Sequence, residues 1–143
     1  GGAIAIGSDS NIRISLSEEI RTLEYSQRLR DHSRAALASD DKSTGRRIFD
    51  EIVAGGANAA GRKTGKISVG YWADLLALDS NAINLVGLED DTILDSFVFA
   101  GDDRLVKDVW SAGRHLIKNG RHVKFESLLN TYLQTMQSIS MDM

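Results

Sequence analysis

Residues 2–11 read Gly2-Ala3-Ile4-Ala5-Ile6-Gly7-Ser8-Asp9-Ser10-Asn11, an apolar run that ends abruptly in polar side chains. A strand without polar alternation is typical of a parallel sheet, in which both faces are buried. The carboxylate of Asp9 comes where that run stops. Because ligands bind at the carboxyl ends of strands in barrels and open α/β sheets, Asp9 is a candidate for chemistry. It can equally be a turn former or a cap of the next helix.

The composition indicates a globular protein of one or two compact units. The chain has 143 residues, of which 42% are hydrophobic, and a net charge of −3. It has no cysteine, which excludes disulfides and thiolate metal sites and fits a cytoplasmic protein. Basic residues are scattered among acids, and no apolar run approaches the ~20 residues of a membrane span. We therefore expect neither nucleic acid nor a membrane as partner.

The start of the chain is unusual. It begins with Gly-Gly in place of Met and enters an apolar strand at once. A strand buried on both faces needs neighbours that are not encoded beside it. We therefore expect the sequence to be a piece of a longer protein.

Two helices are predicted after this strand. Ser15-Leu16-Ser17-Glu18 is a capping box, so a helix should start there and reach about Ala38. Ser43 or Thr44 should cap a second helix, which the pair Gly55-Gly56 should break or kink.

The second half of the chain has a different character. Residues 73–79 and 105–112 have the pattern of strands, residues 90–99 favour a helix, and residues 125–139 form a final amphipathic helix. Asn119-Gly120 predicts a type I′ hairpin within residues 116–122, because both residues tolerate a positive φ. The order predicts an α/β edge that passes into a small β-rich unit.

Two motifs of known chemistry fail on inspection. Residues 61–66 look like a phosphate loop, but only three residues separate the glycines and no buried strand precedes them. His115 and His122 could lie diagonally on one face of the hairpin as zinc ligands. Two polar residues at the edge of a sheet are the plainer explanation.

Four stretches fit one known pattern. They are residues 7–11 with 15–30, the strand Ala73-Asp74-Leu75-Leu76-Ala77-Leu78-Asp79, residues 106–114, and residues 120–122. Together they resemble the end of the catalytic (β/α)8 TIM barrel and the return to the β-sandwich in the amidohydrolase superfamily. The resemblance implies an α/β fold in which residues 1–61 end the barrel, residues 62–124 join a composite β-sandwich, and residues 125–143 form a C-terminal helix.

The resemblance also implies a site. Asp9 matches the acid that lies at a divalent metal, usually zinc, at the end of the eighth strand, both as metal ligand and as catalytic group. Ser10 and Asn11 match pocket-lining positions. The helix after Asp9 is most similar to that of the deiminases that act on N-formimino-L-glutamate in histidine breakdown. The remaining metal ligands are absent from this sequence, so we expect these residues alone to be inactive.

Other functions stay open at this point. A guanine- or cytosine-type deaminase, or a chlorohydrolase-like enzyme, would share Asp9 and the later strands. A non-catalytic α+β binding module is the alternative of another class. We also expect a homo-oligomer, because strands at residues 3–6, 73–78 and 105–112 would expose unpaired edges.

Overall fold

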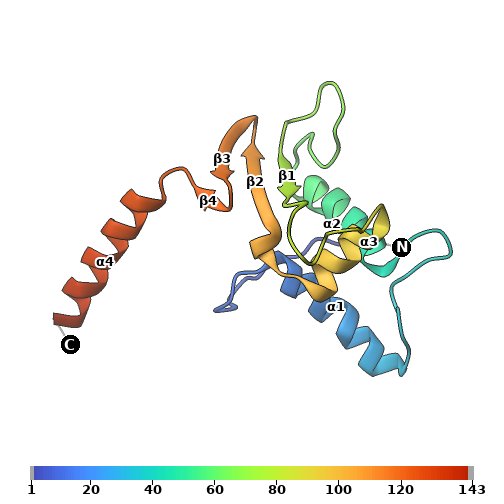
Figure 1. Ribbon diagram of the computed structural model, residues 1–143. Helices are drawn as coiled ribbons and strands as arrows, with labels where there is room; N and C mark the ends of the chain where they lie inside the picture. The colour runs from blue at the N-terminus through green and yellow to red at the C-terminus, as the bar shows by residue number, and fades with distance from the viewer. Residues whose placement is uncertain (1, 142–143) are drawn as a thin grey trace.

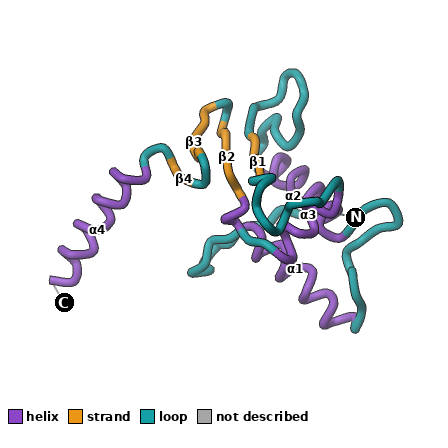
Figure 2. Tube along the Cα trace, in the orientation of Figure 1, coloured by secondary structure: helices purple, strands orange, loops and turns teal. Residues whose placement is uncertain are grey.

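The computed structural model describes residues 2–141 and combines helices with one sheet. The helices α1 to α3 gather in one body, the sheet lies beside them, and the last helix projects away from both (Figures 1 and 2). This mixed architecture agrees with the predicted α/β class. The elements are, in chain order, α1 (Leu16–Asp31), α2 (Thr44–Ala59), β1 (Leu75–Leu78), α3 (Asp91–Asp95), a π-helix (Ser96–Ala100), a 3-10 turn (Asp103–Leu105), β2 (Val106–Ser111), β3 (Arg114–Lys118), β4 (Arg121–His122) and α4 (Phe125–Met141).

The opening segment differs from its prediction. Residues 2–8 form no strand, and the four-stranded sheet contains none of them. A doubly buried strand needs a hydrogen-bonded neighbour on each side, and the described chain supplies neither. The segment packs on helices instead: the backbone of Ile4 lies directly against Gly55 of α2.

Helix α1 begins where the capping box places it. The Ser15 hydroxyl accepts a hydrogen bond from the Glu18 amide at 3.2 Å. The helix ends at Asp31, however, and does not reach Ala38. His32 follows in the left-handed conformation with a φ of 49°, and its amide closes the helix on the Arg28 carbonyl. This early end corrects the prediction: a helix stopped by a left-handed residue needs no glycine or proline to mark it.

Helix α2 corrects a second prediction. Ser43 caps it, as one of the two proposed caps, but Gly55-Gly56 does not break it before Ala59. At Gly55 a Cβ would collide with the carbonyl oxygen of Ile4, whereas at Gly56 it would meet nothing within 4 Å. Gly55 therefore allows two backbones to approach closely and does not interrupt the helix.

The helical body is held by side chains that cap neighbouring elements. Asp95 of α3 accepts a hydrogen bond from the Gly45 amide at the start of α2, at 2.7 Å. Arg21 of α1 donates to the carbonyls of Val98 and Gly101 at the end of the π-helix, at 2.8 and 2.6 Å. These bonds satisfy polar groups that helix ends leave unpaired. They surround a core of Ile20, Ile48, Ile52, Leu85, Phe97, Val98 and Leu105.

The sheet is antiparallel throughout, in the order β1-β2-β3-β4. Both strands predicted in this half are present, and residues 91–100 are helical as expected. Asn119 and Gly120 have φ values of 48° and 73°, which confirms the predicted hairpin between β3 and β4. Asp74 fastens the preceding loop to this sheet, because its carboxylate accepts the Ala112 amide at 2.7 Å and the Thr64 hydroxyl at 2.9 Å.

The final helix is present as predicted but contacts little. All of its described residues are exposed, and Figure 1 shows it projecting from the end of the sheet. Among residues 2–141, no helix has both the length and the apolar character needed to cross a membrane.

Candidate functional site

Asp9 lies in a tight turn between the opening segment and α1. The Asn11 amide donates to the Ser8 carbonyl at 2.8 Å, which closes the turn around Asp9 and Ser10. Asp9 is exposed and has a φ of 40°. Aspartate adopts this left-handed conformation more readily than most residues do. The turn therefore presents the carboxylate to solvent and does not use it to cap α1, which Ser15 caps.

The two neighbours of Asp9 are placed differently from each other. Ser10 donates from its hydroxyl to the Asp9 carboxylate over 3.4 Å, a long and exposed contact. The Asn11 side-chain amide donates to the Glu19 carboxylate at 2.6 Å and so ties the turn to the first turn of α1. Asn11 thus positions the turn, while Ser10 remains beside the carboxylate.

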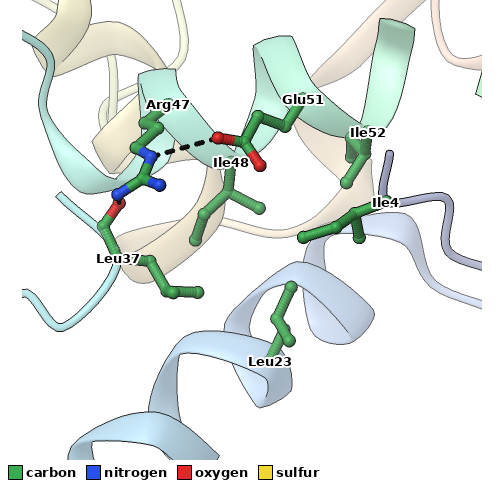
Figure 3. Close-up of a pocket in the computed structure, with 7 residues that line it drawn as sticks. All are labelled: Ile4, Leu23, Leu37, Arg47, Ile48, Glu51 and Ile52. Carbon is green, nitrogen blue, oxygen red and sulfur yellow. Dashed lines mark hydrogen bonds and ion pairs between the residues drawn. The ribbon is translucent and has the colours of Figure 1, made fainter. Parts of the chain in front are cut away.

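The opening segment, which leads into this turn, lines one cavity and one groove. Ile4 lines a cavity of about 60 Å³ between α1 and α2, which Figure 3 shows with Leu23 on α1 and Ile48 on α2 facing it. Ile6 lines a wider and open groove of about 480 Å³, whose walls include Phe49 of α2 and Trp110 of β2. Asp9 lines neither hollow.

The cavity has no group that is free for chemistry. Its polar wall is Arg47 and Glu51, which are joined at 3.1 Å (Figure 3). Arg47 also donates to the carbonyls of Leu37 and Ala38, at 3.2 and 3.0 Å. The remaining lining is aliphatic. This cavity is a packing feature of the helical body, and Arg47 fixes the loop beside it.

A metal does not fit the described residues alone. Residues 2–141 contain no group of three histidine, aspartate or glutamate side chains placed to hold an ion. Catalytic zinc sites have three protein ligands, and Asp9 could supply one. The two histidines that were considered and set aside as zinc ligands have other partners: His115 contacts Asp108 at 2.7 Å, and His122 accepts the Lys124 amide at 3.1 Å.

Two buried or paired groups were not predicted from the sequence. Glu24 is fully buried in α1 and binds Arg28 and two loop amides. The pair of Asp108 and His115 bridges β2 and β3, where the His115 ring stacks on Trp110 with centroids 4.3 Å apart. The second pair depends on the register between β2 and β3, which shifts between Val109 and Trp110, and nothing local in the sequence indicates the burial of Glu24.

Residues 1–116 match the amidohydrolase family. The chain belongs to this family. Over 137 residues, 95% of its length, this amidohydrolase chain is 45% identical to formimidoylglutamate deiminase of Pseudomonas aeruginosa and covers 30% of that protein. The predicted resemblance to the superfamily, and to this deiminase within it, is confirmed.

Solved structures agree with this assignment. The chain superposes on an amidohydrolase from Brucella melitensis with a TM-score of 0.85 and 37% identity, covering 96% of this chain and 30% of that one. It also superposes on the zinc complex of atrazine chlorohydrolase TrzN from Arthrobacter aurescens, with a TM-score of 0.63 and 25% identity over 82% of this chain and 25% of that one. An adenosine deaminase from Xanthomonas campestris with bound zinc shares the fold, with a TM-score of 0.74, 24% identity, and coverage of 94% of this chain and 30% of that one.

Proposed function

We propose that this chain is the C-terminal part of a metal-dependent amidohydrolase that converts N-formimino-L-glutamate to N-formyl-L-glutamate and ammonia. The observation that supports this most is the 45% identity to formimidoylglutamate deiminase over 95% of the chain. The chain spans about 30% of the length of that relative. In this proposal, residues 1–61 end a TIM barrel and residues 62–124 join a β-sandwich, while the preceding sequence supplies the rest.

The proposed reaction is a hydrolysis of the formimino group. Water adds to the formimino carbon, the bond from that carbon to the terminal nitrogen breaks, and the nitrogen leaves as ammonia. Two protons of the water pass to the leaving nitrogen as the new carbonyl forms. Asp9 is our candidate to accept the first of them and pass it on, because an exposed carboxylate without a strong hydrogen-bond donor can act as a general base.

The metal in this proposal needs ligands from outside these 143 residues. Its chemical role would be to lower the pKa of a bound water to about 7. Asp9 would be one of the metal ligands, and Ser10 would line the substrate pocket. Asn11 keeps the turn in place through Glu19. The chain by itself should therefore bind zinc weakly and release no ammonia.

The activity assay distinguishes this function from its alternatives. The complete protein is incubated with N-formimino-L-glutamate, guanine, cytosine or atrazine, and ammonia or chloride release is followed. We expect turnover of N-formimino-L-glutamate alone, and none by the isolated 143-residue chain. Faster release from a nucleobase would contradict the deiminase assignment, and chloride release from atrazine would favour the TrzN-like alternative.

A further inference from the structure

The turn between β3 and β4 contains the only Asn-Gly pair of the chain, Asn119-Gly120. Figure 1 shows these two strands side by side, with α4 following β4. Because glycine has no Cβ, its amide nitrogen can approach the side-chain amide of the residue before it without steric hindrance. Both residues are exposed. The pair can therefore undergo deamidation, a reaction that needs only the peptide itself and water.

Deamidation would begin at the Gly120 nitrogen. As this nitrogen gives up its proton, it attacks Cγ of Asn119, and a cyclic imide forms. The bond from Cγ to Nδ2 breaks, and the released nitrogen takes up the proton and leaves as ammonia. Water then opens the imide at either carbonyl. The product is aspartate, or isoaspartate where the backbone now runs through Cγ.

The folded hairpin holds the attacking nitrogen away from this reaction. The Gly120 amide donates a hydrogen bond to the Lys107 carbonyl of β2 at 2.7 Å. The Asn119 amide donates to the Asp108 carboxylate, also on β2, over 3.4 Å. Because the Gly120 nitrogen must release its hydrogen when it attacks Cγ, the bond to Lys107 opposes the first step. The turn therefore has to leave β2 before Asn119 can react.

Asp108 secures the turn from β2. Its carboxylate contacts Nε2 of His115 on β3 at 2.7 Å, in addition to the Asn119 amide. A carboxylate at residue 119 would add a like charge to a turn that already contacts Asp108, and like charges at short range repel. An isoaspartate would lengthen the backbone of a tight turn in which the hairpin requires φ values of 48° and 73°. Either product disfavours the return of the turn to β2.

We propose that Asn119 is a deamidation site whose reaction rate is set by the release of the hairpin turn from β2. Proteins open locally without unfolding as a whole. Each opening of the turn frees the Gly120 nitrogen, and reclosure on Lys107 restores the protection. Once the imide has formed and opened, the changed turn no longer fits β2, so the loss of this contact is permanent. The site lies outside the turn of Asp9 and does not depend on the proposed function.

Mass spectrometry of the complete protein tests this protection. Deamidation replaces an NH2 group by OH, and digestion locates the resulting mass gain at Asn119. The native protein, the protein unfolded in urea, and a synthetic peptide of residues 114–124 are incubated at the same mildly alkaline pH. We expect the native protein to deamidate at least ~10-fold more slowly than the other two. A native rate equal to that of the peptide would overturn the proposal, as would a peptide that does not deamidate.

Two alanine variants separate local release of the turn from unfolding of the sheet. Asp108→Ala removes the carboxylate that holds the turn. Asp74→Ala is the matched control, because the Asp74 carboxylate holds the turn between β2 and β3 through the Ala112 amide at 2.7 Å. We expect deamidation to be about fivefold faster in Asp108→Ala, as for the loss of one ordinary hydrogen bond, and unchanged in Asp74→Ala. Equal acceleration by both variants would contradict the proposal, as would an unchanged or lower rate in Asp108→Ala.

Discussion

Two carboxylates at α1 are used in opposite ways: Glu24 lies within the helix, and Asp9 lies in the turn that precedes it. In the middle of α1, Glu24 is fully buried and accepts hydrogen bonds from Arg28 at 2.6 Å and from the amides of Ala36 and Leu37, in the loop after the helix, at 2.9 Å each. At the N-terminal side, Asp9 is exposed and accepts one long contact from Ser10.

The difference separates a structural acid from a candidate for chemistry. A buried carboxylate is tolerated only when its oxygens accept hydrogen bonds. The oxygens of Glu24 accept bonds from Arg28 and from two amides of the loop after α1, and so hold residues 32–38 in place. The oxygens of Asp9 remain available to accept hydrogen bonds or a proton, because the bond between Asn11 and Glu19 fixes the turn. Removing Glu24 should therefore damage the fold, and removing Asp9 should damage only the proposed activity.

The largest effect is expected from Asp9→Asn in the complete protein. The substitution is nearly isosteric but removes the proton acceptor, so turnover of N-formimino-L-glutamate should fall by roughly two to four orders of magnitude. Folding should survive the substitution, because Asn11 and Glu19 hold the turn without the Asp9 carboxylate. Steady-state kinetics and urea unfolding measure both, with Asp40→Asn as the matched exposed control. Near-normal turnover would make Asp9 a turn residue only.

Glu24→Ala should give the largest loss of stability. The change leaves two loop amides unpaired and removes the buried partner of Arg28, which itself is one third exposed. We expect the free energy of unfolding to fall by about 3 kcal/mol. Glu24→Gln keeps the shape and should lose about half as much. If urea unfolding shows that the alanine variant loses less than ~1 kcal/mol of unfolding free energy, the hydrogen bonds from Glu24 to the loop at residues 32–38 contribute little to stability.

The two glycines of α2 test how the opening segment is held. Glu24 holds residues 32–38 through its side chain, whereas Gly55 holds the opening segment by letting the Ile4 backbone approach α2. Gly56→Ala has open space and should raise the free energy of unfolding by about 0.5–1 kcal/mol, through helix propensity. Gly55→Ala should lose that gain, because its Cβ meets the Ile4 backbone. It should also speed tryptic cleavage at Arg13 by loosening the opening segment. Equal stabilisation by both variants would show that Ile4 does not lie against α2.

The smallest effect concerns Asp102, a third carboxylate beside the helical body. A side-chain hydrogen bond from Arg104, and then the Arg104 amide, lower the pKa of Asp102 from 3.8 to about 2. A lowered pKa in the folded state adds stability above about pH 4 that disappears as the pH falls toward 2. Asp102→Asn should flatten this part of the acid-unfolding curve. An unchanged curve between pH 4 and 2 would show that this exposed pair contributes nothing.

The sequence predicted those elements whose signals are local. The Ser15 cap, the Asn119-Gly120 hairpin and the strands near residues 75–78 and 106–111 all follow from neighbouring residues, and the structure has them. Errors arose where a distant contact decides the outcome. The opening strand lacks neighbours, and the glycine pair of α2 could be interpreted only once Ile4 was known to lie against Gly55.

The candidate site shows the same division. The position of Asp9 at the end of an apolar run could be predicted, and its exposed turn agrees with an available carboxylate. Its partners in chemistry could not be predicted from this sequence, since residues 2–141 contain no group of three side chains placed to hold a metal ion. Its role therefore stays a prediction until the complete protein is assayed.

The contact between Ile4 and Gly55 has a consequence for how freely this region can vary. It joins one backbone to another, so it depends on the absence of a side chain in α2 and hardly on which side chains residues 3 and 5 carry. A library of random substitutions should therefore tolerate many residues at Ala3 and Ala5, both exposed, and almost none at Gly55. The information that places the opening segment is encoded some fifty residues away from it.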